Sequence, residues 1–161
     1  MIPSQQLLEG IRLCTNNVEQ LLKDASMLFE AGSYGHAQAL AILAMEEYAK
    51  KIVLVARKTH PHRFEEEMKR AFWDHNLKLQ LALDRLIREF PDAPADEQVA
   101  SAIVDLASRL SSLKQVSLYV DYDKDLGWFD PNKRDYKNVA AIQIRYTREL
   151  VAKVDAWLEK I

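Results

Sequence analysis

The sequence is poor in the residues that form cross-links and tight turns. It contains one cysteine (Cys14), four glycines and five prolines in 161 residues. A single cysteine excludes an internal disulfide and a cysteine-based metal cluster, so we expect Cys14 to be a small buried hydrophobic residue. Because few positions can turn sharply, the composition favours long helices over many short strands.

The sequence also lacks the segments that lead a protein to a membrane. No apolar stretch approaches about 18 residues, so no membrane span is expected. The start, MIPSQQLLEG, has no basic flank before an apolar run and is unlike a signal peptide, which makes the cytoplasm the expected location. The net charge of −2 gives no overall attraction to nucleic acid, so any such binding requires a local patch.

Apolar residues recur at spacings of three and four along most of the chain, which predicts amphipathic helices. The expected helices cover residues 4–30, 34–59, 62–89, 96–118 and 136–161. Gly32 is a natural C-terminal stop and Ser33 a natural cap between the first two. Residues 119–135 are expected to be irregular, with their aromatic side chains holding the segment against the helices. The prediction is all-α: one domain, 1–161, folded as an up-and-down four-helix bundle with an additional C-terminal helix.

Charged residues interrupt the second predicted helix within AILAMEEYAKK. Glu46 and Glu47 point about 100° apart on a helix, so they do not share one narrow face. Glu46 can pair with Lys50, and Glu47 with Lys51, as two surface ion pairs at i,i+4. A carboxylate that follows the uncharged run 39–45 can instead lie at the edge of the core and belong to a site.

The stretch KRAFWDHNLK places His75 and Lys78 one helical turn apart on a shared face. Arg70 precedes His75 by five residues, giving the spacing R-x-x-x-x-H, and Asp74 can pair with Arg70 or Lys78. One interpretation is a solvated, ion-paired face with an incidental histidine. The other is a cationic cluster around an imidazole, which suits phosphodiester chemistry because a base removes a proton and cations stabilise the developing negative charge.

A basic segment without acidic residues extends over positions 50–63 and contains a second R-x-x-x-x-H, Arg57 to His62. It is either a phosphate-facing patch or an ordinary basic helix terminus. Metal sites are not expected. Asp121, Asp123 and Asp125 alternate as in a calcium loop, but the required glycine and the final acid are missing. The repeated Glu-x-x-His of di-iron bundles is absent too. We therefore expect no metal and no cofactor.

Three stretches together resemble the AbiV family of bacterial abortive-infection proteins, which belongs to the HEPN superfamily. They are YGHAQALAILAMEEYAKK, DHNLK, and LKQVSLYVDY followed by a Trp and a Pro, and the resemblance runs from about Leu21 to Pro131. It implies an all-α HEPN bundle, usually a symmetric homodimer, and a role in phage defence. The family pattern falls on Glu46, Glu47, Lys50, His75, Lys78, Lys114, Tyr119 and Asp121.

Many HEPN proteins are metal-independent endoribonucleases whose R-x(4–6)-H motif meets its copy across the dimer. That motif usually lies near the start of the last core helix, whereas Arg70 and His75 fall in the third predicted helix, and His75 is the last histidine of the chain.

Two hypotheses follow. In the first, the chain is an RNA-cleaving defence effector in which His75 is the general base or acid, Arg70, Lys78 and Lys50 hold the phosphate, and Glu47 orients a cation or the imidazole. In the second, it is a non-catalytic module that dimerises or binds a phage or host protein; the net charge and the motif's position favour this hypothesis somewhat. The residues expected to bind substrate or partner are Glu46, Lys114, Tyr119, Asp121 and Arg57.

Overall fold

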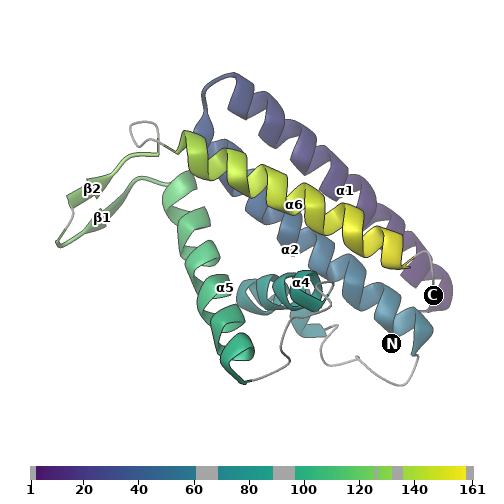
Figure 1. Cartoon of the computed structure of the whole chain (residues 1–161). Helices are drawn as coiled ribbons and strands as arrows, with labels where there is room; N and C mark the ends of the chain where they lie inside the picture. Colours follow the sequence, from purple (N-terminus) through teal and green to yellow (C-terminus); the bar gives the residue numbers. More distant parts are fainter. Residues whose placement is uncertain (1–2, 61–68, 89–96, 126, 132–135, 159–161) are drawn as a thin grey trace.

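The computed structural model in Figure 1 is almost entirely helical, and it describes residues 3–60, 69–88, 97–125, 127–131 and 136–158. The elements in chain order are α1 (Ser4–Glu30), α2 (Tyr34–Thr59), α4 (His75–Arg88), α5 (Glu97–Leu118), β1 (Asp121–Asp123), β2 (Gly127–Phe129) and α6 (Lys137–Leu158). The all-α prediction is confirmed. Among the described helices, none is both long and apolar enough to cross a lipid bilayer.

The first two helices have the predicted bounds, and the turn between them follows from Gly32. Gly32 has a φ of +80°, a conformation that glycine adopts without steric cost. Its N–H donates to Phe29 O, and the N–H of Ser33 donates to Leu28 O, the paired bonds of a Schellman motif. The side chain of Ser33 does not cap α2 as expected; its hydroxyl lies 3.0 Å from Nδ1 of His36.

The third predicted helix is wrong as a single element. Residues 69–71 are helical, the chain turns at Phe72 and Trp73, and α4 begins at His75. Asp74 fixes this start, because its carboxylate accepts a hydrogen bond from the N–H of Leu77 at 2.9 Å. Residues 62–68 and 89 of the predicted helix lie outside the described part of the chain.

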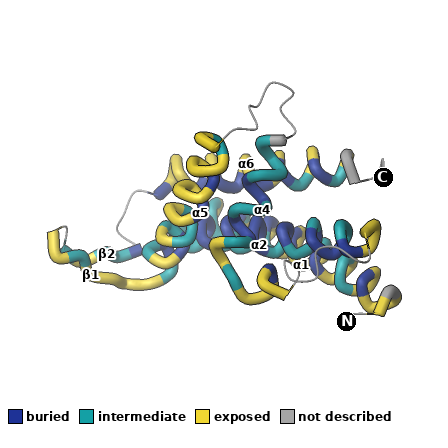
Figure 2. Tube along the Cα trace, turned by 90° about the horizontal axis from the view of Figure 1, so that it is seen from below, coloured by how far each residue is buried: buried dark blue, intermediate teal, exposed yellow. Residues whose placement is uncertain are grey.

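Helix α2 is the centre of the molecule. It packs against α1, α4, α5 and α6, and α6 also contacts α1 (Figure 1). Buried residues therefore occur around most of its circumference (Figure 2) rather than along one stripe. Ile42, Met45 and Tyr48 of α2 join Leu79 of α4 and Leu150 of α6 in the largest hydrophobic cluster. A polar side chain buried in the middle of α2 thus requires a hydrogen-bond partner.

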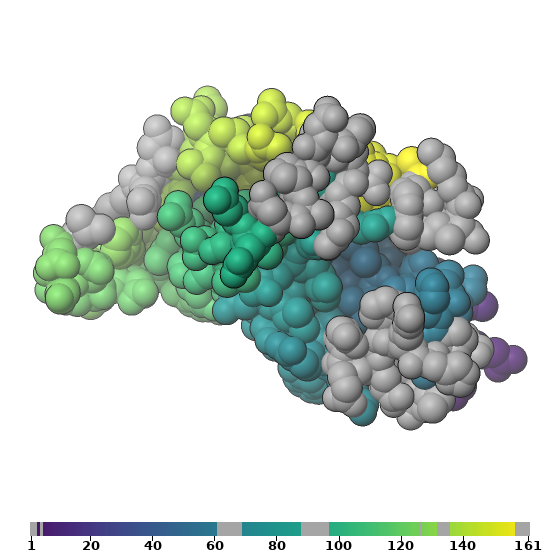
Figure 3. Space-filling view, turned by 60° about the horizontal axis from the view of Figure 1, so that its bottom comes forward, coloured from purple at the N-terminus to yellow at the C-terminus, as the bar shows by residue number. Residues whose placement is uncertain are grey.

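A short hairpin projects from the helical body (Figure 3), where the sequence predicted an irregular segment. Strands β1 and β2 are antiparallel, with Tyr122 opposite Trp128. Those two rings pack against each other, with centroids 5.2 Å apart, and remain 58% and 75% exposed. The expectation that these aromatics hold the segment against the helices is therefore wrong.

The chain after the hairpin returns to the start of α2 at Gly35. A Cβ atom added to Gly35 would lie 2.9 Å from the carbonyl oxygen of Pro131 and 3.1 Å from that of Ser117. Both neighbours are backbone atoms, so only glycine permits this close approach.

Candidate functional site

The described residues contain one carboxylate that is bound by side chains from two other helices. Glu46 of α2 is 2% exposed. Its Oε1 accepts a hydrogen bond from Nζ of Lys114 at 2.5 Å. Its Oε2 is bonded to Nδ1 of His75 and lies 3.3 Å from Nζ of Lys78. The four side chains, from α2, α4 and α5, are hereafter called the Glu46 cluster.

Local structure explains how α4 supplies two members of the cluster. His75 and Lys78 lie one turn apart in the first turn of α4, so they face the same side. Asp74 caps this helix through Leu77, and Arg70 lies 3.4 Å from the Asp74 carboxylate. These contacts fix the start of α4, and His75 and Lys78 connect it to Glu46 of α2.

Electrostatics keep Glu46 ionised. Burial raises the pKa of Glu46, but hydrogen bonds from Lys114 and His75 lower it by more, so the pKa lies below its ordinary value. The side chains of Lys78 and Lys114 are only 5% and 4% exposed. Their charges are therefore directed at the buried carboxylate and not at solvent.

His75 is the exposed member of the cluster, with 55% of its side chain accessible. A carboxylate only accepts hydrogen bonds, so Nδ1 carries the proton that it donates to Glu46. Nζ of Lys114 lies 3.3 Å from the same nitrogen. Nε2 has no hydrogen-bond partner among the described residues. A carboxylate that holds one imidazole nitrogen while the ring stays exposed is an arrangement compatible with general base catalysis at the other nitrogen.

Glu47 does not join this cluster. It pairs with Lys50 at 2.6 Å, and it interacts with Cys14 of α1, on another side of α2. The hypothesis that Glu47 orients the imidazole is therefore wrong, because Glu46 is the carboxylate bonded to His75. The predicted i,i+4 pairs, Glu46 with Lys50 and Glu47 with Lys51, are wrong as well.

Lys51 belongs to a second polar group that the sequence did not indicate. Its Nζ lies 2.6 Å from Asp155 of α6, whose carboxylate also accepts a hydrogen bond from the Tyr48 hydroxyl at 2.7 Å. A partner 104 residues away has no local sequence signal. This group connects α2 to α6, whereas Glu46 connects α2 to α4 and α5.

The other candidate residues lie apart from the cluster. Arg57 and Lys51 are only 4% and 8% exposed. Neither side chain can contact a phosphate at the surface, so the predicted basic patch is wrong for these two residues. His62 lies outside the described residues. Tyr119 and Asp121 are exposed at the base of the hairpin, where the Asp121 carboxylate accepts the N–H of Tyr122.

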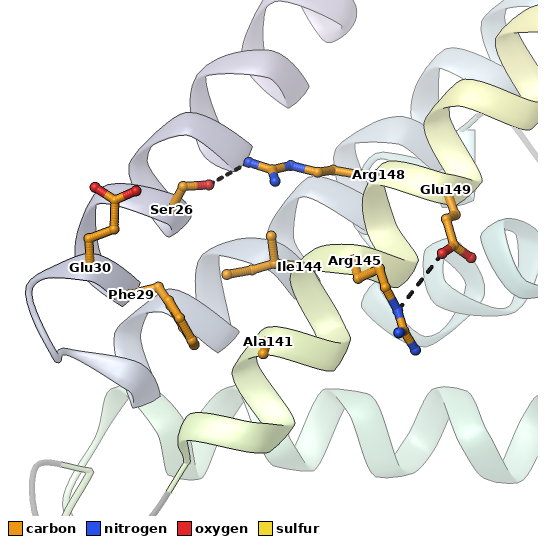
Figure 4. Close-up of a pocket in the computed structure, with 8 residues that line it drawn as sticks. All are labelled: Ser26, Phe29, Glu30, Ala141, Ile144, Arg145, Arg148 and Glu149. Atoms are coloured by element: carbon orange, nitrogen blue, oxygen red, sulfur yellow. Dashed lines mark hydrogen bonds and ion pairs between the residues drawn. The ribbon is translucent and has the colours of Figure 1, made fainter.

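The described residues contain no group of three or more metal-ligating side chains. A pocket of about 400 Å³ lies between the end of α1 and α6 (Figure 4). Its two arginines are occupied: Arg148 donates to Ser26, and Arg145 lies 3.8 Å from Glu149. The pocket therefore offers no free cation to a ligand.

The fold and the cluster define a class of helical protein in which a buried carboxylate orients an exposed histidine from a neighbouring helix. Residues 6–152, most of the chain, match the HEPN_AbiV family, described as AbiV, so the chain belongs to this HEPN-type family of abortive-infection proteins. The family resemblance seen in the sequence is confirmed. Neither the curated proteins nor the solved structures contained a match.

Proposed function

We propose that this protein is an abortive-infection effector that cleaves RNA without a metal, with His75 as the general base. One observation carries the proposal. Nδ1 of His75 is bound to Glu46, a carboxylate fixed by two buried lysines, while the imidazole itself stays exposed. Such support fixes both the tautomer and the direction of the ring before a substrate arrives.

The reaction would use the 2′-hydroxyl of RNA as its nucleophile. Nε2 of His75 takes the proton of this hydroxyl, and the 2′-oxygen forms a bond to the adjacent phosphorus. The bond from phosphorus to the 5′-oxygen breaks, and the proton held by His75 returns to that oxygen directly or through water. The products are a 2′,3′-cyclic phosphate and a 5′-hydroxyl, so no metal-bound water is needed.

The neighbouring cations divide into two roles. Arg70 lies five residues before His75 and pairs with Asp74 at 3.4 Å, and its side chain is 65% exposed, so we assign it to holding the phosphate. A guanidinium can contact two phosphate oxygens at once. Lys78 and Lys114 are buried against Glu46, so we assign them to positioning the carboxylate. Lys50, which pairs with Glu47, has no assigned role in the reaction.

An RNA cleavage assay tests this proposal. Wild type and His75→Ala are incubated with total RNA and with tRNA, each with and without EDTA. We expect cleavage that survives EDTA and is lost in His75→Ala. His60→Ala is the matched control, because His60 is also exposed but lies at the end of α2, outside the cluster. Equal cleavage by His75→Ala and wild type would reject His75 as the base.

A non-catalytic binding module is the second candidate. The observation that favours it is the burial of Lys78 and Lys114, which leaves few cations near His75 to contact a phosphate. In that case the cluster would stabilise a surface for a phage or host protein, or for a second copy of the chain. Intact RNA in every lane, together with a shift from dimer to monomer in His75→Ala by light scattering, would support this candidate.

A further inference from the structure

The turn before His75 exposes a large aromatic side chain. Trp73 is 84% exposed, more than any other large hydrophobic residue in the described part of the chain. Most tryptophans in a folded chain bury much of their ring, so an exposed one beside a candidate site is available for contact with a ligand.

The backbone of this turn is fixed. The N–H groups of Trp73 and Asp74 both donate to the carbonyl oxygen of Arg70, at 3.0 Å and 2.8 Å. Asp74 then caps α4 through Leu77. Two trans peptide units separate Trp73 from His75, so their Cα atoms lie within about 7 Å of each other. Trp73 and His75 therefore project from backbone positions close enough for one bound nucleotide to contact both side chains.

Two basic side chains lie at or beside this turn: Arg70, which pairs with Asp74 at 3.4 Å, and Lys50, which pairs with Glu47 at 2.6 Å. The side chain of Arg70 is 65% exposed. Phe72, which is 40% exposed, has Nζ of Lys50 at 5.8 Å from its ring centroid. Exposed aromatic rings interleaved with basic side chains are typical of surfaces that bind single-stranded RNA, because the rings stack on unpaired bases and the cations contact the backbone.

We propose that Trp73 is a stacking platform for an unpaired base of single-stranded RNA, next to the phosphodiester that His75 would attack. The proposal deepens the proposed function and rests on it for the identity of the reacting phosphate. The hairpin provides a contrast on the same chain. Trp128 is 75% exposed but lies opposite a strand bounded by Asp121 and Asp123, whose negative charges disfavour a phosphate backbone.

The test is the affinity for a fluorescein-labelled single-stranded RNA of mixed sequence with 2′-O-methyl groups. This probe has no 2′-hydroxyl and cannot be cleaved by the proposed reaction, so binding is measured alone. We expect Trp73→Ala to raise Kd by roughly 5- to 150-fold, the range expected for one stacked base. Trp73→Phe should retain most of the affinity, and Trp128→Ala, the matched control, should bind as the wild type does.

Three results would overturn the stacking proposal. They are no binding of the probe by wild type, equal Kd values for wild type and Trp73→Ala, and a loss of binding that accompanies a change in oligomeric state. The last would make Trp73 a protein contact. The nuclease proposal is tested separately. Probe binding that depends on Trp73, with no cleavage of unmodified RNA, would reject the nuclease alone; cleavage with equal Kd values would reject the stacking alone.

Discussion

Nζ of Lys114 on α5 donates a hydrogen bond to Oε1 of Glu46 on α2 at 2.5 Å, although 68 residues separate them. Both side chains are almost completely buried. Removing one partner from a buried ion pair leaves the other charge without compensation, which costs far more than the loss of a surface pair. The Glu46 cluster should therefore dominate the effect of mutations at the junction of α2, α4 and α5.

Replacing Glu46 tests this directly. Glu46→Gln keeps the shape of the side chain but removes the charge that Lys78 and Lys114 face. We expect the free energy of unfolding to fall by about 3 kcal/mol, measured by urea denaturation with circular dichroism. Glu149→Gln is the control, because Glu149 is 46% exposed in a 3.8 Å pair and should change stability by less than about 0.5 kcal/mol. Similar losses of unfolding free energy in both variants would show that the buried ion pairs of Glu46 contribute no more than a surface pair.

The lowered pKa of Glu46 predicts how the free energy of unfolding depends on pH. Burial raises the pKa of Glu46, but the hydrogen bonds from Lys114 and His75 lower it further, so the folded value lies below the unfolded value near 4.5. A group with a lowered folded pKa contributes stability that is fully present above the unfolded pKa and is lost as the pH falls through the folded pKa.

The difference in unfolding free energy between wild type and Glu46→Gln should therefore be largest near neutral pH and shrink on acidification below about pH 4. Urea denaturation of both proteins at a series of pH values measures it. A difference that stays constant, or grows, as the pH falls would contradict the assignment of Glu46 as the ionised centre of the cluster.

Gly35 should not tolerate even a methyl group. In most helix positions alanine is more stable than glycine by up to about 1 kcal/mol. At Gly35 the added Cβ would meet the carbonyl oxygen of Pro131 at 2.9 Å, so we expect Gly35→Ala to destabilise by about 1 to 3 kcal/mol. Gly10→Ala is the matched control, since its Cβ would meet only the end of the Leu54 side chain, at 3.2 Å. Thermal melting compares the two, and a higher Tm for Gly35→Ala would show that the hairpin end can move away.

Cys14 should be unreactive in the folded protein. Burial, with a smaller contribution from the Glu47 carboxylate, raises the pKa of the Cys14 thiol to about 12. The thiolate is the reactive form, so labelling with a thiol reagent near pH 8 should be slow in buffer and fast in concentrated urea. Because the chain has no other cysteine, the labelled mass reports this position alone. Rapid labelling without urea would show that α1 opens from α2.

Some of the fold could be predicted because its signals are local. The bounds of α1 and α2 follow from apolar spacing and from Gly32, which the folded chain uses at positive φ. Two local signals were missed. Asp74 before His75 marks the N-terminus of a helix, and a glycine between two aromatic, aspartate-rich runs is typical of a hairpin. The first signal predicts that a helix begins near His75, and the second predicts a hairpin in the segment that was expected to be irregular.

The candidate site could be predicted only in part. His75 and Lys78 are one turn apart, so their shared face follows from helix geometry alone. Helix geometry does not show whether Glu46 or Glu47 belongs to the site. Other helices contact α2 on several sides, so periodicity does not identify one inward face.

The sequence by itself determined the helical class, the first two helices, the AbiV family and the pairing of His75 with Lys78 on one face. These depend on residues close together in the chain or on a pattern of residue types. Only the tertiary structure decided that Glu46 is the buried carboxylate, that Lys114 and His75 meet it, and that Trp73 stays exposed. The reason is physical: a buried charge selects its partners by distance and solvent exclusion after the helices have packed, and neither quantity is encoded in the spacing of residues along one helix.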